Sequence, residues 1–226
     1  LEACGFEGWV VGGCVRDALL GQTPHDWDLC TNATPAQMHR CFAGLHLIDT
    51  GLRHGTVTAR VDHQSYEVTT YRADGVYEDG RRPNEVRFVR SIEEDLARRD
   101  FTINAMAWHP ARGIADPFLG RQDLAAGVIR CVGDPTQRLQ EDALRIFRAL
   151  RFASVLGFAI APETDRALRK ERGGLARIAP ERIREELVRL LCGKSAEQIL
   201  DRYAEIFFEV LEPLRPMRGF DQCNPH

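Results

Sequence analysis

The hydrophobic pattern changes partway along the chain, and this change constrains the fold more than any other feature. Up to about residue 133, short β-branched runs alternate with turns rich in Gly, Pro, Asn and Asp. After the segment CVGDPTQRL (131–139), strands become hard to find, and apolar residues recur at helical spacing. The sequence therefore predicts an α+β fold in which a mixed sheet with helices is followed by a helical segment.

Local patterns place several elements. Residues 8–11 indicate a strand, and Gly12 and Gly13 then turn the chain into a helix that ends at Gly21. Ser195 and Gln198 have the spacing of a capping box that opens a later helix. Further predicted elements are a strand over 26–31, a helix over 35–42, an antiparallel hairpin of 56–61 and 65–71, a long charged loop over 73–85, and helices over 141–152 and 180–192.

Composition excludes several classes of protein. The 226 residues, 44% hydrophobic and 28% charged, are enough for one or two domains with a core. No window reaches the roughly 20 apolar residues of a membrane span, and no signal peptide is evident, so we expect a cytoplasmic protein. Seven scattered cysteines indicate reduced thiols rather than a zinc site. The net charge of −3 argues against bulk coating of nucleic acid. A start at Leu1 and a polar end, DQCNPH, lead us to expect a fragment.

Two carboxylates, Asp26 and Asp28, suggest a metal site. On a strand both side chains would point to one face while Trp27 and Leu29 face the core. Two oxygen ligands on a rigid element suit Mg²⁺, although a DxD also arises by chance in a chain of this composition. Glu67, in the predicted hairpin, is either a third carboxylate that accepts a proton or completes the metal site, or an exposed acid on a strand.

The glycine pair just upstream supports phosphate chemistry. Gly12 and Gly13 would let backbone N–H groups approach a phosphate, with Arg16 adding positive charge, although a simple strand-to-helix turn explains them equally. With the carboxylate pair, this turn indicates nucleotidyl or phosphoryl transfer. In the segment 95–105, which ends near Asn104, Arg99 could hold a triphosphate and Asp100 a ribose hydroxyl, or the two could tie helix to sheet.

The segment EDALRIFRALRF (141–152) carries charges at every third position among apolar residues. These charges are Asp142, Arg145, Arg148 and Arg151. Taken alone, they are typical of a salt-bridged amphipathic helix.

Six motifs follow one another in the order and spacing of the class II tRNA nucleotidyltransferases. The chain resembles this family, the CCA-adding enzymes and their relatives the bacterial poly(A) polymerases, from about residue 8 to 215. The segments that carry the resemblance are GGCVRD (12–17), DWDL (26–29), GTVTAR (55–60) with YEVTTYR (66–72), RRDFTINAMA (98–107), DPFLGRQDL (116–124) and EDALRIFRALRF (141–152).

The resemblance implies a fold and an activity. It implies a polymerase β-like nucleotidyltransferase head with a mixed five-stranded sheet over residues 1–133. A helical neck and partial body follow over 134–226 and would select the nucleotide and bind RNA, cut short before a further C-terminal domain. The implied activity is addition of CCA to tRNA 3′ ends from CTP and ATP, with release of pyrophosphate. A poly(A) polymerase, a CC-only or A-only enzyme, and a non-catalytic RNA-binding relative stay open as alternatives, and the sequence does not predict the oligomeric state.

The resemblance also implies roles for individual residues. Gly13 and Arg16 would contact the nucleotide phosphates, and Arg99 would lie near the triphosphate or ribose. Asp26 and Asp28 would bind Mg²⁺, with Glu67 less firmly implied as a third carboxylate. The charges of 141–152, namely Asp142, Arg145, Arg148 and Arg151, would line the nucleotide pocket.

The spacing of Asp142 and Arg145 gives a physical basis for base choice. Helical residues three apart are neighbours, so both side chains could address one planar ligand. Cytosine and adenine each present an amine donor beside a ring-nitrogen acceptor, which a carboxylate and a guanidinium complement. Uracil and guanine present the reverse order and would be rejected. Arg148 and Arg151 drift round the helix and are better placed for phosphates, RNA or neighbouring acids.

Overall fold

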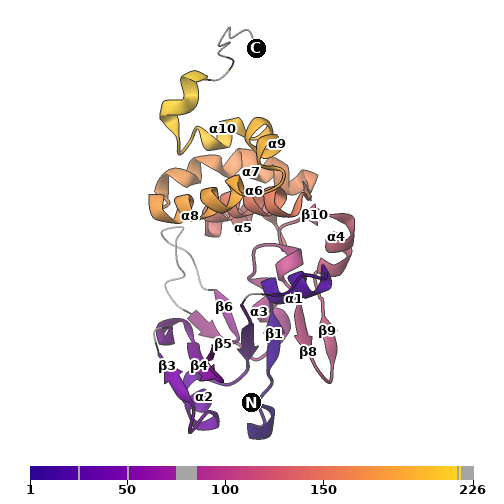
Figure 1. Cartoon of the computed structure of the whole chain (residues 1–226), viewed down its shortest axis with the longest axis vertical. Helices are drawn as coiled ribbons and strands as arrows, with labels where there is room; N and C mark the ends of the chain where they lie inside the picture. The colour runs from indigo at the N-terminus through magenta and orange to yellow at the C-terminus, as the bar shows by residue number, and fades with distance from the viewer. Residues whose placement is uncertain (25, 50, 75–85, 218, 220–226) are drawn as a thin grey trace.

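The computed structural model describes residues 1–24, 26–49, 51–74, 86–217 and 219. The strand-rich part forms a sheet at one end, and helices stack over the other end of that sheet (Figure 1). This arrangement confirms the α+β prediction. The sheet contains β1 (Trp9–Val11), β2 (Asp28–Thr31), β3 (His46–Ile48), β4 (Thr56–Val61), β5 (Gln64–Thr70), β8 (Ala107–His109) and β9 (Gly113–Ala115).

The sheet is mixed, as predicted, but has seven strands rather than five. The order is β3-β4-β5-β2-β1-β8-β9, and the two outermost strands are only three residues long. The sequence analysis located the three-residue strand β1 because the glycine turn follows it, whereas the equally short β3, β8 and β9 carry no readable alternation and were missed. The parallel pair β2 and β5 lies at the centre, in a register that places Asp28 beside Glu67.

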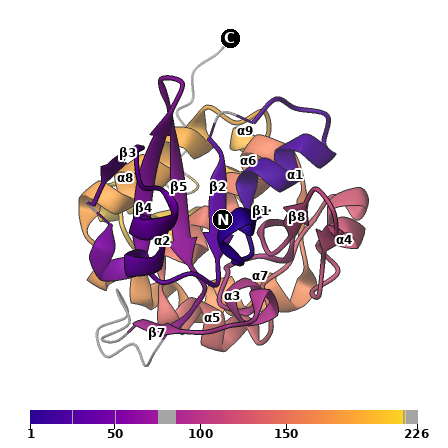
Figure 2. The same ribbon diagram turned by 90° about the horizontal axis from the view of Figure 1, so that it is seen from below.

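Both faces of the sheet are covered because side chains alternate along its strands. On one face, Trp9, Cys30 and Tyr71 pack with Leu96 of α3 (Ile92–Ala97). On the other face, Val57 and Val68 pack against α2 (Pro35–Cys41), which confirms the predicted helix over 35–42. Figure 2 shows the sheet from below, with the helical part behind it.

The predicted hairpin is present, formed by β4 and β5. Asp62 and His63 both have positive φ, 48° and 66°, as a tight two-residue turn requires. The predicted loop over 73–85 begins later than expected, because β6 (Arg72–Asp74) pairs with β7 (Val86–Phe88). The rest of that loop, 75–85, lies outside the described residues.

The helical part is built around α6. Its elements are α5 (Pro135–Glu141), α6 (Leu144–Leu156), α7 (Pro162–Glu171), α8 (Pro180–Leu191), α9 (Ala196–Arg202) and α10 (Ala204–Phe207). Ile146, Phe147 and Leu150 of α6 are fully buried, and Phe147 meets Phe207 edge to face at 5.5 Å between ring centroids. The predicted helix over 180–192 is confirmed as α8.

Two sequence predictions in this region are wrong. The segment 141–152 is not one helix, since Asp142 is extended (φ −146°, ψ 104°) and separates α5 from α6. Asp142 follows the last residue of α5, and its Oδ1 accepts from the backbone N–H of Leu144, the first residue of α6, at 3.0 Å. The capping box is also absent, because the Ser195 side chain makes no capping hydrogen bond at the start of α9.

Smaller elements complete the described chain. They are α1 (Gly13–Leu19), α4 (Gly120–Ala126), the strand pair β10 (Val128–Ile129) and β11 (Ala159–Ile160), and the 3₁₀ turns Glu2–Cys4, Leu52–His54, Thr102–Asn104, Arg172–Arg177 and Glu212–Met217. Within the described ranges, no helix has both the length and the apolar character to cross a membrane.

Gly120, the first residue of α4, packs tightly against the 3₁₀ turn Thr102–Asn104. Asp116 accepts from the backbone N–H groups of Gly120 and Arg121, and a Cβ on Gly120 would lie 2.2 Å from the carbonyl oxygen of Thr102. Gly120→Ala should therefore lower the free energy of unfolding by about 2 kcal/mol in urea titrations. Gly173→Ala, where a Cβ meets nothing within 4 Å, should change it by less than about 0.5 kcal/mol. Equal losses for the two variants would contradict this packing.

Candidate active site

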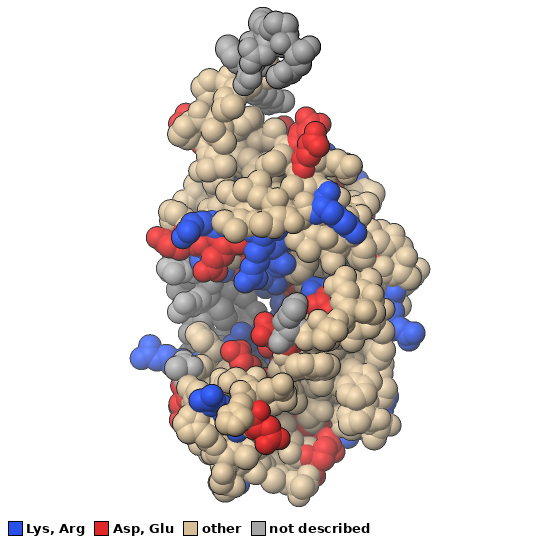
Figure 3. All heavy atoms as spheres, viewed as in Figure 1, with Lys and Arg blue, Asp and Glu red and all other residues tan. Residues whose placement is uncertain are grey.

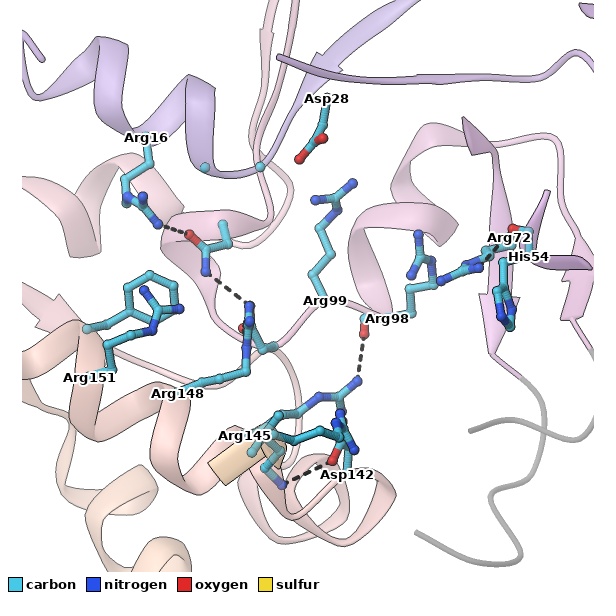
Figure 4. A pocket seen from close by; sticks show the side chains of 17 residues that line it. Arg16, Asp28, His54, Arg72, Arg98, Arg99, Asp142, Arg145, Arg148 and Arg151 are labelled. Carbon is cyan, nitrogen blue, oxygen red and sulfur yellow. Dashed lines mark hydrogen bonds and ion pairs between the residues drawn. The ribbon is translucent and has the colours of Figure 1, made fainter. Parts of the chain in front are cut away.

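A pocket of about 650 Å³ lies between the sheet and the helical part. In Figure 3 a hollow lies between the two, and both basic and acidic side chains border it. Of the residues singled out in the sequence, all line this pocket except Asp26 and Glu67; the lining members are Gly12, Gly13, Arg16, Asp28, Arg99, Asp100, Asn104, Asp142, Arg145, Arg148 and Arg151. Segments more than 100 residues apart in the chain therefore converge as predicted (Figure 4).

The glycine turn forms one wall of the pocket. Gly12 has φ 80° and ψ −131°, a conformation that favours glycine, and α1 begins at Gly13. A Cβ on Gly12 would lie 2.8 Å from Nη1 of Arg99, so the missing side chain also makes room for that guanidinium. Arg16, one turn into α1, donates from Nη1 to Oδ1 of Asn104 at 2.6 Å. The guanidinium groups of Arg16 and Arg99 thus both lie beside the backbone of this turn.

Of the two carboxylates, Asp28 lines the pocket and Asp26 does not. Asp28 is the first residue of β2, and Asp26 precedes the strand. The expectation that Trp27 faces the core is wrong: its side chain is 40% exposed, because the chain is not yet in the sheet at that position. Leu29 does pack against the core, as predicted.

The electrostatics of this pair fit a cation. Partial burial raises the pKa of Asp28, the charge of Arg99 lowers it, and the charge of Asp26 raises it again. A divalent cation would relieve the repulsion between the two carboxylates. Glu67 is exposed on β5, directly beside Asp28 and on the same face of the sheet. Within the part of the chain that the structure describes, no three His, Cys, Asp or Glu side chains form a metal-binding group. Two carboxylates are oxygen donors of the kind that a divalent cation binds together with substrate phosphates.

A buried acid that sequence reasoning missed, Asp95, positions the pocket arginines. It is completely buried and accepts from Arg98 at 2.9 Å and from Arg99 at 3.3 Å. Burial alone would raise the pKa of Asp95, but the charges of Arg98 and Arg99 lower it. The carboxylate also accepts from the backbone N–H of Arg72, and thereby joins α3 to β6.

Asp100 connects the sheet end to the helical part. Its Oδ1 accepts from the backbone N–H of Phe101 at 2.8 Å and from Asn104 Nδ2 at 3.1 Å, and its Oδ2 accepts from Arg148 Nε at 2.8 Å. Burial works to raise the pKa of Asp100, yet the charge of Arg148 and the hydrogen bonds of Asn104 and Arg148 lower it to about 2. The contact with a ribose stays a prediction, and the observed role of Asp100 is to hold Asn104 and Arg148 in place.

Asp142 and Arg145 are both anchored from outside α6. Oδ2 of Asp142 accepts from Nη2 of Arg182 on α8 at 2.8 Å. Arg145 is buried and donates from Nη1 to Glu141 at 2.6 Å and from Nη2 to the carbonyl of Arg98 at 3.3 Å. Since Asp142 lies outside the helix, the predicted i, i+3 relation fails, although both side chains still line the same pocket.

Arg148 and Arg151 lie against neighbouring acids, one of the placements predicted for them. Arg151 Nε donates to Oε2 of Glu186 at 2.5 Å, and Arg148 Nη1 lies 3.6 Å from Oε1 of the same residue. The Arg151 guanidinium also lies 3.9 Å from the centroid of the Phe152 ring. Glu186 of α8 is therefore the acid that holds the side chains of Arg148 and Arg151 in position.

Sequence reasoning missed several residues of the site. Arg182 and Glu186 lie four residues apart in the predicted helix over 180–192, so they share a face, but no local pattern says which helix that face meets. The other missed residues that line the pocket or hold its side chains are His54, Arg72, Asp95, Arg98, Glu141, Leu144 and Phe152.

Comparison with known proteins agrees with this geometry. The family model described as "Poly A polymerase head domain" matches residues 8–130, and one described as "Probable RNA and SrmB- binding site of polymerase A" matches residues 157–214. A CCA-adding enzyme of Leuconostoc mesenteroides is 49% identical over 201 residues, which cover 89% of this chain and 50% of that protein.

Solved structures show the same similarity. A Bacillus stearothermophilus CCA-adding enzyme in complex with CTP is 44% identical, with a TM-score of 0.80 over 88% of this chain and 48% of that one. A Thermotoga maritima CCA-adding enzyme complexed with tRNA is 30% identical, with a TM-score of 0.71 over 91% and 48%. A CCA-adding enzyme with ATP is 31% identical, with a TM-score of 0.73 over 91% and 47%. The chain thus spans about half the length of the relatives it matches.

The mixed sheet, the glycine turn and the carboxylate pair all lie in the part of the chain that the poly A polymerase head-domain model matches. The chain belongs to the family of the poly A polymerase head domain, which includes the CCA-adding enzymes, and the resemblance seen in the sequence is confirmed. Enzymes of this family normally use a divalent metal ion.

The pH dependence of stability tests the buried connection at Asp100. Its pKa is about 2 in the folded chain and ~3.9 in an unfolded one. The folded state therefore binds fewer protons, so this stabilisation is complete above about pH 4 and is lost as the pH falls towards 2. Asp100→Asn should lower the free energy of unfolding at pH 7, and its deficit relative to wild type should shrink by about 2 kcal/mol between pH 4 and pH 2.

The exposed Asp201 of α9 provides the control for this measurement. Asp201→Asn should show a small deficit that varies little over the same pH range. A pH-independent deficit for Asp100→Asn would contradict the ion pair.

Proposed function

We propose that this chain is the catalytic portion of an enzyme that adds CCA to tRNA 3′ ends from CTP and ATP and releases pyrophosphate. The observation that carries the proposal is one pocket that brings the Gly12–Gly13 turn and Asp28 together with Asp142 and Arg145. The similarity to CCA-adding enzymes in complex with CTP, ATP and tRNA supports the same substrates and partners.

The residues divide the chemistry between them. The Gly12–Gly13 turn accommodates the triphosphate, and Arg16 and Arg99 neutralise its charge. The terminal ribose hydroxyl of the RNA attacks the α-phosphate in line, and pyrophosphate leaves. Asp26 and Asp28 would hold Mg²⁺, which when bound offsets charge on the attacking and leaving oxygens. Glu67, beside Asp28, accepts the hydroxyl proton or completes the metal site.

Side chains of the helical part select the base. The carboxylate of Asp142 accepts from the exocyclic amine of cytosine or adenine, and Arg145 donates to the adjacent ring nitrogen. Uracil and guanine place a carbonyl against the carboxylate and an N–H against the guanidinium, so both polar contacts fail. Arg148 and Arg151 complete the pocket around phosphate or ribose. Asp100 and Asn104 hold the nucleotide-binding arginines in position.

The proposal includes a division of labour along the chain. Residues 1–133 form the catalytic head, and residues 134–226 form the neck and the start of a body that selects nucleotide and binds RNA. We place the enzyme in the cytoplasm. A poly(A) polymerase is the second candidate, because the head-domain family carries that description.

Ordered nucleotide addition tests this function. With Mg²⁺ and single labelled nucleotides, tRNA that lacks CCA should gain only C from CTP, and tRNA that ends in CC should gain one A from ATP. Asp26→Asn and Asp28→Asn should each lower incorporation by more than about a hundredfold, whereas Asp201→Asn on α9 should not. A long A tract on any RNA would favour the polymerase, and full activity of either head variant would overturn the proposed chemistry.

A further inference from the structure

The ring of Phe152, on α6 and in the wall of the pocket, contacts three guanidinium groups. The guanidinium carbon lies 3.9 Å from the ring centroid in Arg151, 5.0 Å in Arg16 and 5.7 Å in Arg148. Arg16 lies on α1, whereas the other two arginines lie on α6 (Figure 4). One neutral side chain therefore joins cations from both sides of the pocket.

These contacts lie in the range in which an aromatic ring attracts a cation. The attraction acts within about 6 Å of the ring centroid and grows when the cation is removed from water. The side chains of Arg16 and Arg151 are only 11% and 12% exposed. Burial lowers the pKa of the Arg151 guanidinium, Glu186 raises it, and the charge of Arg148 lowers it again. The arginines therefore repel one another, and attraction to the ring offsets part of that repulsion.

The acids beside these arginines do not by themselves bring them together, because they lie on different elements. Arg16 pairs with Asp17 of α1 at 2.7 Å, Arg148 with Asp100 at 2.6 Å, and Arg151 with Glu186 of α8 at 2.5 Å. Phe152 contacts all three arginines. A ring attracts guanidinium groups without adding negative charge, whereas a further carboxylate in its place would repel a phosphate.

We propose that Phe152 is a positioning residue that holds these three arginines together as one site for the triphosphate of the nucleotide. The ring keeps the guanidinium groups close together before the ligand arrives. Binding therefore does not have to draw them together against their mutual repulsion, and the affinity for the triphosphate rises. The inference rests on the proposed function, in which Arg16 binds the triphosphate and Arg148 and Arg151 complete the pocket.

A role in packing alone makes a different prediction. Phe152 is 4% exposed and packs edge to face on Phe101, with 5.8 Å between ring centroids. Phe147, on the same helix, packs edge to face on Phe207 in the same way, but it is not part of the pocket wall. If only packing matters, equivalent changes at the two positions should have equivalent effects. Phe147 is therefore the matched control.

The experiment replaces ring hydrogens by fluorine, which weakens the attraction of the ring for cations while nearly keeping its shape. Phenylalanine with one ring fluorine or with three is incorporated at position 152 of the 226-residue chain. Calorimetric titration then measures the affinity for inorganic triphosphate in the presence of Mg²⁺. One fluorine should lower the affinity by about threefold and three fluorines by about tenfold, because the ring contacts three cations. The same residues at position 147 should leave it within about twofold of wild type.

A simpler pair of variants removes the ring altogether. Phe152→Leu and Phe147→Leu lose similar volume from α6, and thermal melting of each reports whether the fold is retained. Only Phe152→Leu should weaken the binding of triphosphate. The fluorinated series keeps the test decisive if either leucine variant does not fold.

The outcomes separate this inference from the function on which it rests. A wild-type chain that binds triphosphate, with an affinity that stays constant as fluorines are added at position 152, would overturn the role of Phe152 and leave the proposed function standing. Equal losses at positions 147 and 152 would do the same, because packing would then explain them. A wild-type chain that does not bind inorganic triphosphate would overturn phosphate binding by the arginines, and the role of Phe152 with it.

Discussion

The pocket depends on one buried ion pair, between Asp100 at the end of the sheet and Arg148 on α6. A carboxylate removed from water is costly unless donors satisfy it, and here donors come from both parts of the molecule. Arg148 approaches from the helical part, and Asn104 and the backbone of Phe101 approach from the head. The side chain of Asp100 thus links the two walls of the pocket, and Arg145 adds a second link through the carbonyl of Arg98.

The connections continue outward from that pair. Asn104 accepts from Arg16 on α1, and Arg148 shares Glu186 of α8 with Arg151. This network runs from Arg16 on α1 to Glu186 on α8. It explains how a chain with a net charge of −3 still presents a strongly basic cavity. Internal acids pair with some arginine donors and fix their directions, while the remaining donors suit a triphosphate.

The sequence predicted what local spacing controls. The strand, Gly12–Gly13 turn and helix follow from a few adjacent residues, as does the β4–β5 hairpin with its turn at Asp62 and His63. Motif order brought Asp28, Arg99 and Asp142 into one predicted site because each belongs to a recognisable segment. The edge strands β3 and β9 were missed because three residues are too few to show a period.

The remaining features depend on contacts between distant segments. Asp142 lies in a segment with helical spacing, yet its backbone is extended and its side chain accepts from the backbone N–H of Leu144 between α5 and α6. Its partner Arg182 lies 40 residues away on α8, and the sequence does not predict which element that face of α8 contacts. Asp95 is one of three acids in the first turn of α3, and no local pattern distinguishes it from the other two. Its complete burial and its contacts with Arg98 and Arg99 are seen only in the structure.

The central claim is that protein side chains read the base, and a crystal structure of this chain with CTP and Mg²⁺ tests it most directly. The account predicts the cytosine amine at ~3 Å from the carboxylate of Asp142 and the ring nitrogen at ~3 Å from the guanidinium of Arg145. The triphosphate should lie along the Gly12–Gly13 turn. A cytosine whose amine and ring nitrogen face solvent or backbone, with Asp142 and Arg145 still bonded only to protein, would contradict the account.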